Sequence, residues 1–267
     1  MIGQEMVIDQ VANFLTSDNT TGILIGKEGS GKKTLLRELL YNVPSVFVED
    51  TKKDTIKDLI STMYMVKTPM IYVIPDIESM SVAAMNSLLK VTEEPPNNAM
   101  IVLTCTNLGY VLPTLQSRSM KFYMQPYTKE ELKEYCNIVG LQGDEDFVLS
   151  VCDTPGEIDK LGSSGVDEFK KYVYLVFDNI AEVSGTNALK IGSRLSLKEG
   201  EDGFNLALFY QAFMKLCQEE YINTKNEKYK NGIYITDIWL NDLRVKGINK
   251  AALFDTWVLE IRRSWMV

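Results

Sequence analysis

A run of glycines and lysines near the N-terminus has the spacing of a phosphate-binding loop (P-loop). Gly26-Lys27-Glu28-Gly29-Ser30-Gly31-Lys32 matches the core Gly-x4-Gly-Lys. In such a loop successive backbone N–H groups can surround phosphate oxygens, and Lys32 would add a positive charge. This core arises by chance in roughly 7% of chains of this length. Here it follows a predicted strand and precedes a predicted helix, which favours a genuine nucleotide site.

The next residue is unusual for a magnesium-dependent ATPase. A P-loop holds magnesium through a Ser or Thr hydroxyl, but this position is Lys33, whose charge would repel the metal. Thr34 lies about 100° further round the helix and cannot simply replace it. We therefore expect binding of ATP or ADP to be weak or absent, and efficient hydrolysis to be lost. The predicted nucleotide-binding residues are Gly26, Gly29, Ser30, Gly31, Lys32, Lys33 and Thr34.

A second phosphate-site element should follow an apolar strand, and Met70 to Glu78 is the candidate. A hydrolytic site needs Asp for magnesium and then Glu to activate water. If the strand ends at Ile74, these positions hold Pro75 and Asp76, and a shift of one residue leaves Ile77 in the Glu position. Both alignments are defective. A structural role for acidic residues at a turn is as reasonable as a residual metal role.

Arg118 lies in a loop before the last predicted strand. An arginine in a loop is usually solvated or makes a local salt bridge. Its place in a Ser-Arg pair at the end of a P-loop domain suggests a second role, that of an arginine finger reaching the nucleotide of a neighbouring subunit.

Composition excludes several other kinds of chemistry. The chain has 267 residues and no histidine, which removes Ser-His and Cys-His nucleophiles and histidine metal sites. The four cysteines form no Cys-x-x-Cys pair, so buried free thiols are expected and no zinc site. The net charge of −8 argues against strong stand-alone DNA binding and favours protein partners. Three tryptophans in helical surroundings are expected to pack in cores.

These residues need elements to position them, and the first half of the chain alternates short apolar runs with amphipathic segments. The alternation predicts a parallel sheet covered by helices on both faces. The predicted strands are Gly22–Ile25, Ser45–Val48, Met70–Ile74, Met100–Thr104 and Met120–Tyr123. The predicted helices are Glu5–Leu15, Lys32–Leu40, Thr55–Met65 and Val82–Val91.

After about Tyr123 only helical patterns remain. Thr128 and Glu131 have the spacing of a capping box that starts a helix. Residues 162–165 are predicted to be a linker, and further breaks are predicted at 184–186 and 200–203. The expected domains are an α/β P-loop domain at 1–124, a small helical lid domain at 125–163 and a larger helical domain at 166–267. No segment has the length and apolarity of a membrane span, and the N-terminus lacks the features of a secretory signal, so we expect a cytoplasmic protein without a membrane partner.

Several motifs, in order, resemble those of the clamp-loader AAA+ family. The segment Asn86 to Pro96, NSLLKVTEEPP, is very similar to the family signature Asn-x-Leu-Leu-Lys-x-x-Glu-Glu-Pro. Ile2 to Glu5 resembles the opening of these domains, and Leu112 to Arg118 resembles the stretch that ends in their Ser-Arg-Cys motif, with Ser119 replacing the Cys. The resemblance covers roughly residues 1 to 161.

The resemblance implies specific roles for several residues. Arg118 would act in trans as an arginine finger, and Thr106 or Asn107 would be the sensor on the fourth strand. The family's zinc-binding cysteine cluster is missing. The segment Cys152 to Glu157 stands where a motor subunit carries an Arg that senses the γ-phosphate, and its Pro-Gly version is similar to delta-prime subunits of the DNA polymerase III clamp loader, which do not hydrolyse ATP.

The resemblance also implies partners. These would be other clamp-loader subunits of the motor and delta types in a hetero-oligomer, with the sliding clamp and primer-template DNA reached only through the complex. The helices of 166–267 would correspond to the collar that joins the subunits. Two other hypotheses stay open at this point: a working P-loop ATPase or phosphotransferase, and a clamp-loader-like protein of a phage or mobile element.

Overall fold

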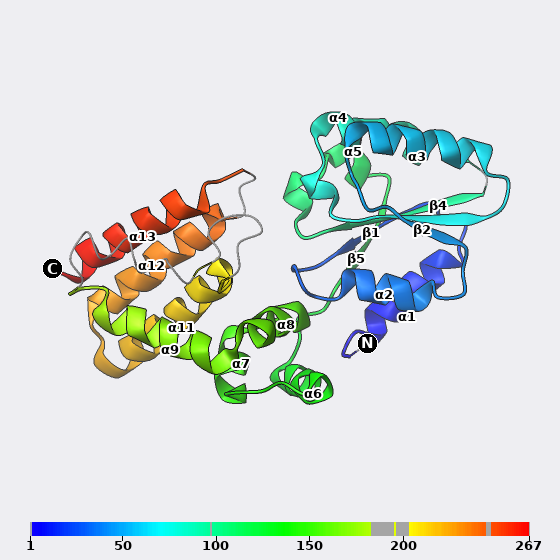
Figure 1. The fold of residues 1–267 in the computed structure, drawn as a ribbon. Coiled ribbons are helices and arrows are strands. Elements are labelled where there is room, and N and C mark those ends of the chain that lie inside the picture. The colour runs from blue at the N-terminus through cyan, green and yellow to red at the C-terminus, as the bar shows by residue number, and fades with distance from the viewer. Residues whose placement is uncertain (1, 97, 183–194, 196–202, 244–246, 267) are drawn as a thin grey trace. The chain divides into compact units, whose positions relative to one another are not determined.

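The computed structural model describes residues 2–96, 98–182, 195, 203–243 and 247–266 (Figure 1). The chain divides into two compact units, residues 1–131 and 132–267. The predicted break at 184–186 and most of the one at 200–203 lie outside the described residues. Because the two units are placed independently, the predicted division into three domains stays a prediction.

The first unit is built on a parallel sheet of five strands, in the order β2-β3-β4-β1-β5. The central strands β1 and β4 are buried at every residue except Met100, and most of their residues are apolar, as expected for strands covered on both faces. This sheet confirms the predicted α/β class. The strands are β1 (Thr21–Ile25), β2 (Ser45–Phe47), β3 (Met70–Ile74), β4 (Ala99–Cys105) and β5 (Met120–Tyr123).

Helices cover both faces of the sheet (Figure 1). One face carries a core with α1 and α2, and the other a core with α3, α4 and α5. All four helices predicted from periodicity are present, with boundaries that differ by at most two residues. The helical segments of this unit are α1 (Glu5–Leu15), α2 (Lys32–Leu39), α3 (Lys53–Met65), η1 (Ile77–Ser79), α4 (Val82–Glu93), η2 (Leu108–Tyr110) and α5 (Pro113–Gln116).

The second unit consists of helices around an aromatic core. Trp257 is fully buried and makes an edge contact with the ring of Phe213 at 4.9 Å between centroids. Trp265 stacks on the same phenylalanine at 5.6 Å, so both tryptophans have the predicted packing role. The helices are α7 (Glu145–Val151), α8 (Pro155–Ser164), α9 (Val166–Asn179), α11 (Leu206–Thr224), α12 (Glu227–Asp242) and α13 (Lys250–Trp265), while α6 (Lys129–Val139) crosses the boundary between the units.

Two details concern the predicted helix boundaries. The capping box at α6 is confirmed, because the Glu131 carboxylate accepts from the Thr128 N–H at 2.7 Å and the Glu131 N–H donates to the Thr128 hydroxyl at 3.2 Å.

The linker predicted at 162–165 is wrong for 162–164, which form the last turn of α8. Only Gly165, at φ +86°, separates α8 from α9. The Ser hydroxyls at 163 and 164 bond back to the Lys160 carbonyl, which lets this Gly-Ser stretch stay helical.

In the described residues, no helix combines the length and apolarity needed to cross a membrane. All four cysteines are buried and free, as the sequence predicted.

Candidate nucleotide site

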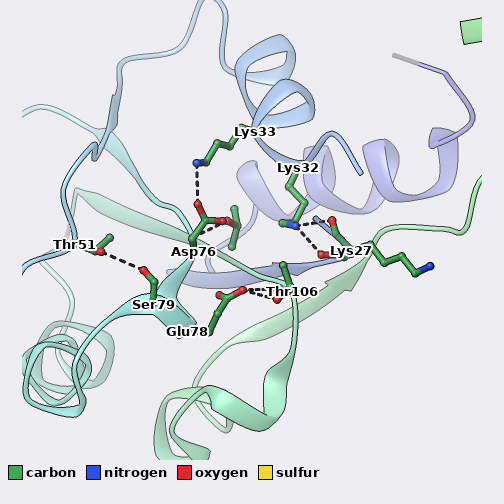
Figure 2. Close-up of polar contacts among 10 residues, drawn as sticks. Lys27, Lys32, Lys33, Thr51, Asp76, Glu78, Ser79 and Thr106 are labelled. Carbon is green, nitrogen blue, oxygen red and sulfur yellow. Dashed lines mark hydrogen bonds and ion pairs between the residues drawn. The ribbon is translucent and has the colours of Figure 1, made fainter. Parts of the chain in front are cut away.

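The candidate site lies at the carboxyl edge of the sheet. The P-loop follows β1, the acidic turn follows β3, and Thr106 follows β4. The strand order places β4 between the other two, and because parallel strands all end at the same edge, three segments distant in sequence meet there. Figure 2 shows this meeting of Lys32, Lys33, Asp76, Glu78 and Thr106.

The loop has the backbone of a phosphate cradle. Gly29 and Gly31 have φ of +75° and +85°, a region that suits glycine, and Gly31 is the N-cap residue directly before α2. A Cβ at Gly26 would stand 2.6 Å from the Cγ of Met124 and 2.8 Å from the Oγ of Ser30. Glycine therefore suits all three positions: Gly29 and Gly31 because of their positive φ, and Gly26 because a Cβ would clash. These requirements explain the glycine spacing of the sequence motif.

Lys32 is held by the loop itself. Its Nζ donates to the carbonyl of Gly26 at 2.6 Å and to that of Lys27 at 2.9 Å. The residue is buried, and burial lowers the pKa of its ammonium group, while the charges of Asp76 and Glu78 act in the opposite direction. The loop thus carries a buried cation that is already orientated by its own carbonyl groups.

Lys33 does not point the same way. Its Nζ lies 2.9 Å from Oδ2 of Asp76, the acidic residue that follows β3 (Figure 2). The two side chains are about half exposed, at 49% and 47%. A solvated pair of this kind contributes about 0.2–1 kcal/mol. The ion pair therefore occupies the space between Lys33 and Asp76, but it is weak enough to be broken at little cost in free energy.

The acidic turn separates the roles of its two carboxylates. Asp76 has φ +49°, and its N–H donates to the Thr104 hydroxyl at 3.1 Å. Glu78 turns toward β4, where its Oε1 accepts from the N–H and the hydroxyl of Thr106 at 2.6 and 2.7 Å. Its other oxygen, Oε2, is buried and has no hydrogen-bond partner among the described residues. Glu78 is the site residue that the sequence reading did not assign, and its position two residues after Asp76 was the available signal.

The other predicted site residues are distributed as follows. Thr106 reaches the acidic turn, whereas Asn107 bonds its own loop by accepting from the Gly109 N–H at 2.8 Å. Pro75 directly follows β3, which ends at Ile74. The contact with Lys33 nevertheless puts the Asp76 carboxylate beside the position of the missing hydroxyl, as in the second of the two predicted alignments. Thr34 is exposed on α2.

A buried thiol, Cys105, closes the site on the side of β4. Its carbonyl accepts from the Gly26 N–H at 3.1 Å, which ties the start of the loop to this strand. Burial, with a smaller effect of Glu78, raises the pKa of this thiol to about 12. Cys105 is therefore a neutral packing residue. Within the described part of the chain, no cluster of three or more His, Cys, Asp or Glu residues could hold a metal ion.

Arg118 follows α5 and contacts the end of α4. Its guanidinium lies 2.6 Å from Oε1 of Glu93 and donates to the Thr114 carbonyl at 2.7 Å. The side chain is 35% exposed. The local salt bridge that the sequence left open as an alternative is thus present within this chain, with the arginine at the surface.

Segment 152–157 begins α8. The Thr154 hydroxyl accepts from the Glu157 N–H at 3.4 Å, Pro155 occupies the first turn, and the Glu157 carboxylate accepts from the Asp153 N–H at 2.8 Å. Glu157 also accepts from the Gln211 side chain at 3.1 Å. Thr154 and Glu157 thus form a reciprocal cap at the start of α8, so the residue types of this segment have a local structural role.

Comparison with known proteins points to one group. The profile of the family described as DNA polymerase III, delta subunit, matches residues 44–128. DNA polymerase III subunit gamma of Buchnera aphidicola subsp. Schizaphis graminum is 22% identical over 181 residues, covering 55% of this chain and 50% of that protein. Replication factor C subunit 3 of Schizosaccharomyces pombe is 23% identical over 163 residues, covering 52% and 48%. The chain spans about half the length of these curated relatives.

The fold agrees. A DNA polymerase III gamma subunit-related protein from Thermotoga maritima superimposes with a TM-score of 0.54 at 19% identity, covering 96% of this chain and 98% of that one. The five-stranded parallel sheet with helices on both faces and the helical second unit fit an AAA+ architecture. The matched family profile and the curated relatives support the resemblance of this chain to the clamp-loader family of AAA+ proteins.

Proposed function

We propose that this chain is a delta-prime-like subunit of a DNA polymerase III clamp loader that does not hydrolyse ATP itself. The observation that carries the proposal is the ion pair between Lys33 and Asp76. In a hydrolytic P-loop these two positions would supply a hydroxyl and a carboxylate to magnesium. Here they bond to each other.

The acidic turn supports the same proposal. A water-activating Glu would need a carboxylate free to accept a proton from an attacking water. Asp76 is paired with Lys33, and Oε1 of Glu78 is taken up by Thr106. The other oxygen of Glu78 is buried, so we propose that neither carboxylate of the turn activates water for hydrolysis.

We further propose that Arg118 acts in trans on the nucleotide of a neighbouring motor subunit. Its cation is partly exposed, and its partner Glu93 is 49% exposed. Such a surface pair contributes at most about 1 kcal/mol, so exchanging Glu93 for a phosphate group has a low cost. The hydrogen-bonded turn after α5 would present the guanidinium.

The partners proposed with this role are clamp-loader subunits of the motor and delta types. The helices of the second unit would provide the collar contacts, and the sliding clamp and primer-template DNA would be met through the assembled complex. The curated relatives carry the names of replication proteins, which supports this assignment.

Steady-state turnover tests the first part. The purified chain should hydrolyse ATP no faster than a Lys32→Ala variant, because the magnesium position is filled by Lys33. A healthy rate that Lys32→Ala abolishes would contradict the proposal and favour a working ATPase.

Arg118→Ala tests the second part in a complex reconstituted with the motor and delta subunits. We expect the ATPase rate of the complex to fall by about 10³-fold, the usual effect of an arginine finger, while the circular dichroism of the isolated chain is unchanged. Lys121→Ala, which removes an exposed positive charge on β5, is the matched control and should leave the rate near that of the wild type. Equal rates for all three complexes would remove the finger role.

A further inference from the structure

The residues at the magnesium position do not fit a magnesium ion. In a P-loop site this metal is held by the hydroxyl that follows the P-loop lysine and by the acidic residue after the neighbouring strand. The first position here is Lys33, and an ammonium group has three donors and no acceptor. Its Nζ stands 2.9 Å from the carboxylate that the metal would need.

No other ligand set in the described residues takes over. Thr34, the nearest hydroxyl in sequence, is exposed and lies about 100° further round α2. The carboxylate of Glu78 is turned to Thr106, and no cluster of three potential metal ligands lies within the described part of the chain. The described residues at this edge of the sheet therefore offer no alternative set of magnesium ligands.

The phosphate side of the site, in contrast, is retained. Gly29 and Gly31 have positive φ values, as phosphate-binding loops require, and Lys32 is orientated within the loop. The hydroxyl of Ser30 is buried, at 4% exposure of the residue, and has no hydrogen-bond partner among the described residues. This unpaired hydroxyl lies against the first glycine of the loop, 2.8 Å from the place of a Cβ on Gly26.

We propose that the Lys33 ammonium is a tethered replacement for the divalent cation, so that the P-loop binds a polyphosphate nucleotide without a metal. Magnesium in such a site links a carboxylate to phosphate oxygens. A lysine can make the same link, because one N–H can stay on Asp76 while the other two donate to phosphate. The half exposure of both side chains leaves room for this. The inference rests on the proposed function only in taking residues 26–32 as a nucleotide site.

Calorimetric titration of ATP into the full chain, once with EDTA and once with excess MgCl2, tests the inference. The wild type should bind at least as tightly in EDTA as in MgCl2. Lys33→Ser removes the tethered cation and restores a hydroxyl, so it should lose about tenfold in affinity in EDTA, as expected when a charged hydrogen bond is lost. It should recover this affinity in MgCl2.

Two further variants make the outcome specific. Asp76→Asn added to Lys33→Ser should abolish the gain from magnesium, and Asn tolerates the left-handed backbone of residue 76. Lys27→Ser is the matched control, since Lys27 is a loop lysine whose side chain extends away from Asp76 (Figure 2). It should weaken ATP binding equally in both solutions and create no need for magnesium.

Three results would overturn the inference: wild-type binding that is tighter in MgCl2 than in EDTA, no wild-type binding in either solution, or a Lys33→Ser variant that binds equally with and without the metal. All three are measured on the isolated chain. If the titration contradicts the role of Lys33, the Arg118 test in the reconstituted complex still decides the proposed function. If the Arg118 test fails, the titration still decides the role of Lys33.

Discussion

At the scale of single residues, the acidic turn after β3 gives two neighbouring carboxylates different tasks. Asp76 is half exposed and meets the cation of Lys33, while Glu78 is turned inward by the short helix η1. Glu78 accepts two hydrogen bonds from Thr106, one of them from the backbone. Glu78 therefore joins the residue that follows β4 to the turn after β3.

Glu78→Ala should lower the free energy of unfolding of the chain by about 1–3 kcal/mol, because the Thr106 N–H and hydroxyl lose a charged acceptor. Urea denaturation followed by circular dichroism measures this. Thr106→Val, which removes only the hydroxyl donor, should cost less. The control Glu49→Ala removes an exposed carboxylate in the same unit. If Glu78→Ala unfolds at the same urea concentration as this control, the fastening role is wrong.

At the scale of elements, α12 packs closely through small residues. Gly232 and Thr236 are the buried residues of this helix, and the Thr236 hydroxyl accepts from Trp257 Nε1 at 3.0 Å. A Cβ on Gly232 would stand 2.9 Å from the sulfur of Cys217 on α11 and 3.3 Å from Nε1 of Trp265 on α13. The glycine thus permits three helices to meet.

Gly232→Ala should destabilise the second unit by about 1 kcal/mol. Alanine favours a helix over glycine by about 1 kcal/mol, but overpacking a tight core costs about 1–3 kcal/mol. Tryptophan fluorescence during urea unfolding reports on this unit alone, because all three tryptophans lie in it. Asn231→Ala, at an exposed neighbouring position, is the control for helix propensity, and Cys217→Ala added to Gly232→Ala should restore stability. A stabilising single change would contradict the packing argument.

At the scale of the whole molecule, charge favours assembly with proteins over independent binding to DNA. The chain carries 36 acidic and 28 basic residues. DNA affinity depends largely on neutralised phosphates, so an acidic protein without a dense basic run has little of that contribution.

The isolated chain should bind primer-template DNA no more tightly than about 10⁻⁶ to 10⁻⁴ M, the range of non-specific binding, and binding should fall steeply with salt. Fluorescence anisotropy of a labelled primer-template measures it, and the reconstituted complex is the comparison. Tight binding by the chain alone, maintained at high salt, would contradict the proposed dependence on partners.

The sequence by itself determined the elements and the motif. Strands β3 and β5 and helix α1 have the residue bounds that periodicity predicted, because burial on one or both faces imposes a pattern on the local sequence. The glycines of the P-loop were likewise readable, since positive φ at Gly29 and Gly31 and close side-chain contacts at Gly26 restrict these positions to glycine.

Only the tertiary structure decided which side chains meet. The pairing of Lys33 with Asp76, of Glu78 with Thr106 and of Arg118 with Glu93 joins residues that are 25 to 43 positions apart. The first two pairs follow from the strand order, which sets β3 beside β4 and β4 beside β1. Local periodicity fixes which face of a strand is buried. It carries no information on which strands become neighbours, because that depends on packing across the whole sheet.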